Sequence, residues 1–210
     1  MKLIYITGSH SSGKSSLLQS LKDTPNIIVF PRQHRKELFN EKEFKLFAKK
    51  EIVKVTVFKN LSERLETSVC ETKKQFQLTK KKSNSFIVAD HFLPDCMAYI
   101  TTCFELGWLN KNEFDILRKR FKKEFLNNVN FGYSVFLIKP SFRKVQENFA
   151  SDSLNNSRFW EQKTNFLKIA YRMFAKIYTE YSPNNINEWQ IIRSNKFEEQ
   201  KSFILKKTYQ

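Results

Sequence analysis

Short apolar runs alternate along this chain with longer stretches in which apolar residues recur at helical spacing. Five of the runs have the length and the nearly continuous apolar character of strands that are buried on both faces. They are residues 2–6, 26–30, 85–89, 134–138 and 189–193. Because helical patterns separate these strands, the sequence predicts an α/β fold with a mostly parallel sheet.

Helices are predicted between the strands. A short helix is expected over residues 15–21, two helices within 36–82, a helical stretch over 93–125 with a break at 107–112, and a long amphipathic helix over 158–181. A polar stretch, about residues 139–158, lies between the fourth strand and the last of these helices. Such a polar excursion near a ligand site is typical of a lid.

The length of the chain, 210 residues, favours a single domain over residues 1–210. No stretch approaches the ~20 apolar residues of a membrane span, so we expect a soluble, cytoplasmic protein without a membrane partner. The cysteines, Cys70, Cys96 and Cys103, are odd in number and lack C-x-x-C spacing. This pattern argues against a disulfide framework or a zinc site and favours buried structural thiols.

The chain carries 37 basic and 21 acidic residues, which gives a formal net charge of +16. Such a charge is expected of a protein that binds DNA or RNA, but the lysine-rich composition of an AT-rich genome would also produce it. The densest basic cluster, residues 118–123, is either a contact surface for a phosphate backbone or the solvated face of a helix. Both readings stay open, and so does the oligomeric state, with a homodimer as one option.

A phosphate-binding loop follows the first predicted strand. The pattern G-x-x-x-x-G-K-[ST] is complete, and its residues, with the serine that follows, are Gly8, Ser9, His10, Ser11, Ser12, Gly13, Lys14, Ser15 and Ser16. The glycines let successive backbone N–H groups turn inward, and the helix that follows directs its positive end to the same point. Lys14 would reach the β- and γ-phosphates and Ser15 would bind the bridging Mg²⁺, so we expect ATP and Mg²⁺ as cofactors.

A second group of chemically active residues follows the third predicted strand. Asp90 stands at the carboxyl end of that strand, the edge at which open α/β sheets bind ligands. It would either hold Mg²⁺ through water or accept the proton of an attacking hydroxyl. The alternative is a surface carboxylate that caps the next helix.

The phosphate loop, together with Asp-His-Phe-x-x-Asp-x-x-Ala-Tyr over residues 90–99, resembles the small P-loop kinases of nucleosides and nucleotides. These include thymidylate kinase, the deoxynucleoside kinases and the nicotinamide-riboside kinase type. The resemblance implies a three-layer fold with a five-stranded parallel sheet in the order 2-3-1-4-5, helices on both faces and an arginine-bearing lid. It also implies transfer of the γ-phosphoryl group of ATP to a hydroxyl or phosphate of a nucleoside or nucleotide.

The sequence departs from this family at two points. His91 stands where an arginine is usual, and residues 31–35 carry Arg35 but lack the acidic residue of the family's Glu-x-x-Arg motif. Asp90 is then the best remaining base, with Asp95 behind it. The resemblance assigns the acceptor and lid contacts to Arg32, Arg35, His91, Asp95 and Arg143, and a catalytic lid arginine to Arg158.

The sequence fits other classes of P-loop protein less well. A GTPase would carry Asp-x-x-Gly after the third strand, whereas His91 and Phe92 follow Asp90 here, so Asn195-Lys196 near the C-terminus is a coincidental match to a guanine-binding motif. Two alternatives to a kinase of small acceptors remain. One is a kinase that acts on a hydroxyl carried by DNA or RNA, and the other is a non-catalytic module that binds ATP.

Overall fold

The computed structural model describes residues 3–30, 38–39, 42, 45–46, 55–81, 85–128, 133–151, 161, 165–182 and 188–209. The strands are β1 (Leu3–Thr7), β2 (Ile27–Phe30), β3 (Phe86–Asp90), β4 (Tyr133–Ile138) and β5 (Glu188–Ile192). The helices are α1 (Lys14–Leu21), α3 (Val55–Lys81), α4 (Leu93–Glu105), α5 (Lys111–Asn128), α6 (Phe142–Ser151), α8 (Phe166–Tyr181) and α9 (Phe197–Tyr209).

The five strands form one sheet in the order β2-β3-β1-β4-β5, and every neighbouring pair is parallel. The predicted fold class and strand order are therefore confirmed. In the central strand, Ile6 is in register with Asp90 of β3 and with Phe136 of β4. Because all strands run the same way, the ends of β1, β3 and β4 meet at one edge, and the phosphate loop and the Asp90 segment both begin there.

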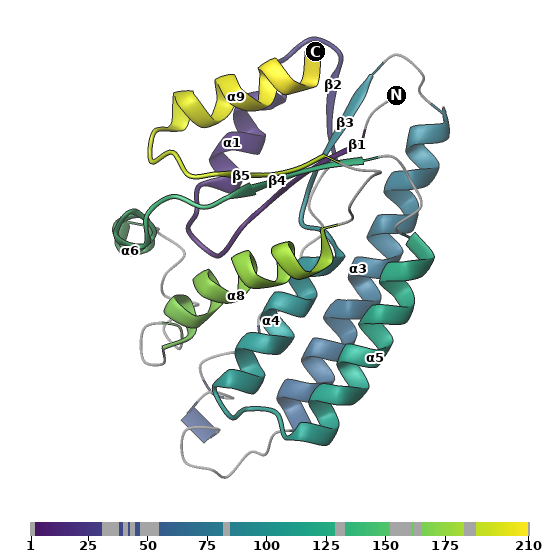
Figure 1. Ribbon diagram of the computed structural model, residues 1–210, viewed down its shortest axis with the longest axis vertical. Helices are drawn as coiled ribbons and strands as arrows, with labels where there is room; N and C mark the ends of the chain where they lie inside the picture. The colour runs from purple at the N-terminus through teal and green to yellow at the C-terminus, as the bar shows by residue number, and fades with distance from the viewer. Residues whose placement is uncertain are drawn as a thin grey trace.

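Helices cover both faces of the sheet, as Figure 1 shows. On one face, Leu3 and Tyr5 of β1 belong to the larger apolar core, which is shared with α3, α4, α5 and α8. On the other face, Ile4 and Ile6 pack with α1 and α9. Alternate residues of β1 thus point into two different cores, which explains why the strand is apolar at successive positions.

The helix α4 lies in the middle of the larger core and packs against α3, α5 and α8. Its first eleven residues are all buried, so the sequence here is almost continuously apolar rather than amphipathic. The hydroxyls of Thr101 and Thr102 are satisfied within the helix, because they donate to the carbonyls of Met97 and Ala98. Buried polar groups need such partners.

Each predicted strand lies within one residue of the observed strand at both ends. The break at residues 107–112 separates α4 from α5, and the helix after the phosphate loop is α1. The described part of 36–82 contains α3 and helical residues at positions 42, 45 and 46. In the predicted lid, α6 is an amphipathic helix with buried Val145 and Phe149, while residues 152–160 lie outside the described part.

The cysteine prediction is confirmed for two of the three thiols. Cys96 and Cys103 of α4 are buried, whereas Cys70 of α3 is exposed, so the expectation of burial is wrong for Cys70. Burial raises the pKa of the Cys103 thiol well above its ordinary value. A thiol that stays protonated is a poor nucleophile, which leaves Cys103 a packing role.

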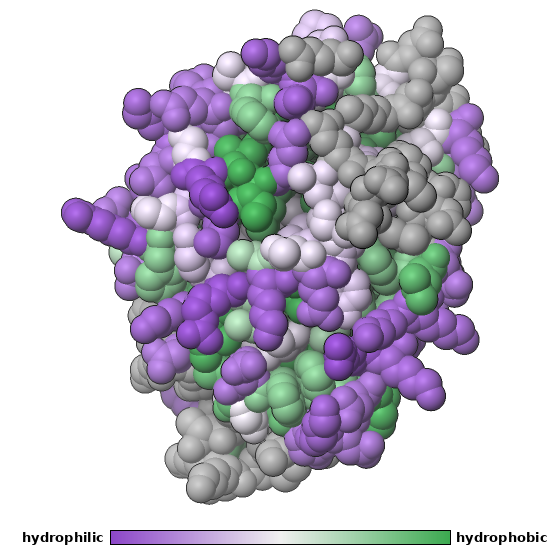
Figure 2. Space-filling view, in the orientation of Figure 1, coloured by the Kyte–Doolittle hydropathy of each residue, from purple (hydrophilic) through white to green (hydrophobic). Residues whose placement is uncertain are grey.

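None of the described helices has the length and hydropathy needed to cross a membrane. Hydrophilic side chains predominate on the face in Figure 2, with hydrophobic ones in separate patches between them.

The two arginines of the basic cluster at residues 118–123 are paired within the molecule. Arg120 lies 2.7 Å from Glu66 of α3, and Arg118 lies 3.7 Å from Glu180 of α8.

Candidate functional site

The phosphate loop turns sharply between β1 and α1. Gly8 has a φ of 149°, and a Cβ atom there would lie 2.4 Å from the carbonyl oxygen of Ile138 and 2.8 Å from Oγ of Ser12. Gly13, which caps α1, has a φ of 95°. Both glycines occupy conformations that other residues rarely adopt, so they are required by the backbone path and not by packing alone.

Lys14, the first residue of α1, folds back over its own loop. Its ammonium group donates to the Ser9 carbonyl at 2.7 Å and to Oγ of Ser12 at 3.4 Å, and the residue is buried. In this position the ammonium group stands at the base of the loop, where the β- and γ-phosphates of a nucleotide would bind. Ser15 and Ser16 follow it and are exposed.

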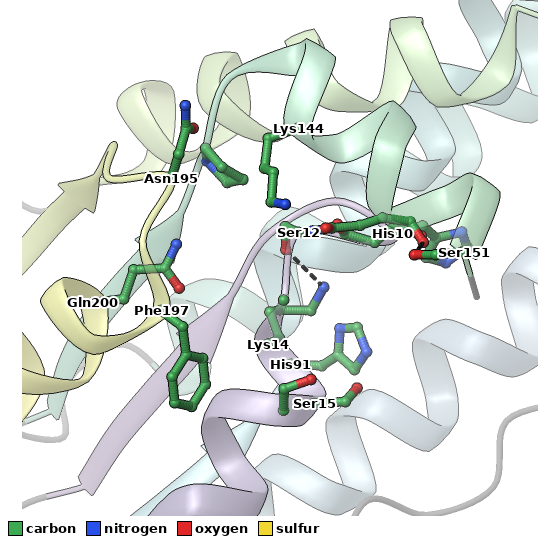
Figure 3. A pocket seen from close by; sticks show the side chains of 15 residues that line it. His10, Ser12, Lys14, Ser15, His91, Lys144, Ser151, Asn195, Phe197 and Gln200 are labelled. Carbon is green, nitrogen blue, oxygen red and sulfur yellow. Dashed lines mark hydrogen bonds between the residues drawn. The ribbon is translucent and has the colours of Figure 1, made fainter. Parts of the chain in front are cut away.

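A cavity of about 500 Å³ opens over this loop (Figure 3). It is lined by residues of the loop together with residues from three other parts of the chain. These are His10, Ser11, Ser12, Gly13, Lys14, Ser15 and Ser16 from the loop and α1, and His91, Pro140, Lys144, Asn148, Ser151, Asn195, Phe197 and Gln200 from elsewhere. Its volume and its mixed lining are typical of a small-molecule site.

At the end of β3, His91 lies between two carboxylates. Its Nδ1 atom is 2.6 Å from Oδ2 of Asp95, and its Nε2 atom is 3.6 Å from Oδ1 of Asp90. All three side chains are buried. His91 adopts a φ of 63°, an unusual conformation for a residue other than glycine. This strained turn carries the imidazole to the wall of the cavity.

The structure places Asp95 deeper than Asp90. Its Oδ1 atom accepts hydrogen bonds from Thr7 and from the hydroxyl of Tyr178, at 2.5 Å for Tyr178. The side chain has no exposed surface and is not part of the cavity lining. Burial and the adjacent Asp95 carboxylate raise the pKa of Tyr178 well above its usual range. Asp95 therefore connects β1, α4 and α8, and its contact with His91 links it to the cavity wall.

The α6 helix brings Lys144 and Asn148 to the cavity. The amide of Asn148 donates to the carbonyl of Ser11 at 3.0 Å, so the helix contacts the tip of the phosphate loop. Arg143, the predicted lid residue on this helix, is 89% exposed and pairs with Glu147 at 3.0 Å. It is not among the lining residues. Of the other predicted anion contacts, Arg32, Arg35 and Arg158 lie outside the described residues.

The turn between β5 and α9 closes the other side of the cavity. Oδ1 of Asn195 accepts a hydrogen bond from the backbone N–H of Ser141 at 2.7 Å, and Nε2 of Gln200 donates to the Ser194 carbonyl at 2.7 Å. The amide N–H groups of Asn195 and the side-chain carbonyl oxygen of Gln200 make no hydrogen bond to another described residue. Phe197 adds an aromatic side chain to the same wall (Figure 3).

Sequence analysis did not place Lys144, Asn148 or Gln200 at the site, because they belong to helices without a recognisable motif and only the fold brings them to the phosphate loop. Asn195 and Phe197 lie in the segment that was set aside as a coincidental match to a guanine-binding motif. One signal did exist for Asn195 and Phe197: they follow the fifth predicted strand, whose carboxyl end lies at the same edge of a parallel sheet.

The described residues contain no group of three or more histidine, cysteine or acidic side chains that could hold a metal by themselves. Mg²⁺ does not require such a group, because it keeps several waters and takes one or two protein oxygens in addition to substrate phosphates. The exposed hydroxyl of Ser15, which lines the cavity, provides one oxygen of that kind. The carboxylate of Asp90 is a second candidate at the end of the neighbouring strand, although Asp90 is buried and is not itself among the lining residues.

No protein-family model matches this chain, and no curated protein matches it. Solved structures do match. The chain superposes over its whole length on a deoxyadenosine kinase from M. mycoides with bound dATP, with a TM-score of 0.73 and 14% identity over 100% of both chains. The fold is that of the P-loop deoxynucleoside kinases.

Two further structures of the M. mycoides deoxyadenosine kinase agree with this result. The one with the products dCMP and dCDP bound has a TM-score of 0.66 and 17% identity, and the one with bound dCTP has a TM-score of 0.68 and 15% identity. Each alignment covers 99% of this chain and 98% of the other. The expected likeness to small P-loop kinases is confirmed at the level of the fold, at 14% to 17% sequence identity.

Proposed function

We propose that this protein is an ATP-dependent phosphotransferase that moves the γ-phosphoryl group to a nucleoside or nucleotide acceptor. The observation that carries the proposal is the complete phosphate loop at the base of a cavity of about 500 Å³ whose wall includes His91. Asp90 lies within 3.6 Å of that histidine. Donor binding and acceptor activation thus have candidate residues at one edge of the sheet.

The triphosphate is held by the backbone N–H groups of the loop and by the positive end of α1. Lys14 exchanges its contact with the Ser9 carbonyl for the β- and γ-phosphates. Lys144 of α6 supplies a second ammonium group to the same cavity. Mg²⁺, when bound with the nucleotide, would neutralise charge that develops on the phosphates, and the hydroxyl of Ser15 would hold it.

Asp90 is the proposed general base, since the family's acidic residue after the second strand is absent. It accepts the proton of the acceptor hydroxyl while the hydroxyl oxygen forms a bond to the γ-phosphorus. The bond from that phosphorus to the bridging oxygen breaks, and ADP leaves. His91 lies 3.6 Å from Asp90, which is an ionic contact and not a hydrogen bond. Asp95 in turn holds His91 at 2.6 Å, so Asp95 is a positioning residue for His91.

The turn between β5 and α9 is the proposed site of the donor base. Phe197 offers an apolar surface for the ring, Asn195 offers amide donors, and Gln200 offers a carbonyl acceptor. A hydrogen-bond donor and an acceptor on the same wall of the cavity suit the ring nitrogen and the exocyclic amino group of adenine, which supports ATP as the phosphate donor.

A small acceptor is favoured over DNA or RNA. The deoxyadenosine kinases that share the fold are described with dATP, dCTP, dCMP and dCDP. In the cluster at residues 118–123, Arg118 and Arg120 are within salt-bridge distance of Glu180 and Glu66, which reduces the charge available to a phosphate backbone. A non-catalytic ATP-binding module remains the second candidate, because the acidic residue after the second strand is missing.

The test is transfer of labelled γ-phosphate from ATP to a panel of deoxynucleosides, nucleoside monophosphates and oligonucleotides, with Lys14→Ala as the inactive control. We expect labelling of a deoxynucleoside or nucleotide that changes little with salt. Labelling of oligonucleotides alone, with affinity falling by a slope of about −0.9 per phosphate contact against log salt, would favour a nucleic-acid kinase. ATP binding without labelling of any acceptor would favour the non-catalytic module.

A further inference from the structure

The third residue of the phosphate loop, His10, contacts a buried carboxylate far away in the sequence. Nδ1 of His10 lies 2.5 Å from Oε1 of Glu161, which belongs to the segment between α6 and α8. The imidazole also packs against Tyr99 and Phe166, with ring centroids 5.3 Å and 6.3 Å apart. His10 is at the same time part of the cavity lining.

Glu161 is almost completely buried, with 1% of its surface exposed. Within the described part of the chain, His10 is the only basic side chain within 4.0 Å of its carboxylate, and Oε2 has no hydrogen-bond partner there. Removing an ionised carboxylate from water without a partner is strongly unfavourable, whereas a cation in direct contact compensates much of that cost. The contact therefore favours imidazolium paired with carboxylate.

A second contact joins the same loop to the same part of the chain. Asn148 of α6 donates to the carbonyl of Ser11, the residue that follows His10. Ser11 has a φ of 54°, so the tip of the loop is held in an unusual conformation. The two contacts fix the loop from α6 and from position 161.

We propose that Glu161 is a positioning residue that keeps His10 protonated and fixed at the phosphate loop, so that His10 adds a positive charge to the triphosphate site. The proposal rests on the proposed binding of ATP at this site. Lys14, Lys144 and His91 also line the cavity and oppose the protonation of His10, while Glu161 favours it. ATP binding should then weaken as the pH rises and His10 loses its proton.

The pair itself is tested in the free protein by NMR titration of the imidazoles. The chain has 3 histidines, and loss of one signal in His10→Gln identifies His10. We expect His10 in the parent protein to titrate at least about one pH unit above His10 in Glu161→Gln, since a carboxylate in contact stabilises the charged form. Equal midpoints in the two proteins would overturn the proposal whether or not the protein is a kinase.

The effect on the site is tested by the dissociation constant of ATP between pH 6 and pH 8.5. Glu161→Gln should weaken binding about tenfold at pH 7.5, the equivalent of one moderate charge interaction, and less at pH 6. His10→Gln should remove this pH dependence, and the double variant should bind no more weakly than His10→Gln. Glu66→Gln, an exposed carboxylate paired with Arg120, is the matched control and should bind as the parent does.

Three outcomes would overturn the role in ATP binding: additive losses in the double variant, a loss for Glu161→Gln that is equal at every pH, or the same loss in the control. Should Glu161→Gln fail to fold, Glu161→Asp replaces it, and the expected shifts in both measurements have the same sign but are smaller. If ATP does not bind to the parent protein, the proposed function fails, while the NMR titration still decides whether Glu161 holds the charge of His10.

Discussion

The imidazole of His91 lies 2.6 Å from the carboxylate of Asp95, one helical turn further along the chain. The same carboxylate accepts a hydrogen bond from Tyr178 of α8. Asp95 thus holds the turn after β3 and the core helix α8 in one network, and its role differs from that of Asp90. Separate substitutions of the two aspartates should reveal this difference.

Asp90→Asn should lower the turnover rate by about 10² to 10⁴, the range expected for a positioned acid–base group, and should change stability little. Asp95→Asn should lower the rate less. It should reduce the free energy of unfolding by about 1–3 kcal/mol, because the buried side chains of His91 and Tyr178 lose a charged acceptor. Turnover and urea unfolding of both variants make the comparison. A larger loss of rate in Asp95→Asn would show that Asp95, not Asp90, acts on the acceptor.

Lys14→Ala should abolish phosphoryl transfer. The ammonium group lies where the β- and γ-phosphates are expected to bind, and it donates to two oxygens of its own loop. Circular dichroism and thermal unfolding should match those of the parent protein. Turnover equal to that of the parent would contradict the role of the loop.

Gly8→Ala should disrupt the phosphate loop. The new Cβ would meet the Ile138 carbonyl at 2.4 Å in a conformation with φ of 149°, which should cost about 2–4 kcal/mol in the free energy of unfolding. The affinity for ATP should fall as well. Gly107 is the matched control, because it also has a positive φ, 70°, but nothing lies within 4 Å of its Cβ position.

For Gly107→Ala we expect only the backbone cost, about 1–2 kcal/mol, with unchanged affinity for ATP. Urea unfolding and ATP titration of both variants measure these quantities. Similar losses of ATP affinity at the two positions would mean that the close approach at Gly8 is unimportant for the site.

The stability of the protein should fall as the pH rises above about 10, the pKa of tyrosine in an unfolded chain. Burial raises the pKa of Tyr178 and of Tyr5 well above that value in the folded state. The folded state therefore binds these protons more tightly than the unfolded state does. Their contribution to stability is present in full below pH 10 and is lost above it.

Tyr178→Phe should reduce the slope of stability against pH in this range, as measured by urea unfolding between pH 8 and pH 11. Tyr209→Phe is the control, since Tyr209 is 52% exposed and should leave the slope unchanged. An unaltered slope in Tyr178→Phe would show that ionisation of this phenol does not contribute to alkaline unfolding.

The strands and the phosphate loop could be predicted from the sequence because their signals are local. A strand that is buried on both faces must be apolar at successive positions, as in β1 and β4. The loop must carry Gly8 and Gly13 because no other residue follows its backbone path without strain. Asp90 could be placed beside the loop because the ends of parallel strands share an edge.

Only the tertiary structure decided which side chains complete the site. Tyr178 is 83 residues from Asp95, and Glu161 is 151 residues from His10. No pattern along the chain marks such pairs, because each depends on how whole helices pack against the sheet. The same holds for Lys144 and Gln200, whose positions at the cavity follow from α6 and α9 lying on either side of the phosphate loop. The sequence by itself determined the strands and the phosphate loop. The packing of whole helices against the sheet determined which side chains lie beside the charged groups at the site.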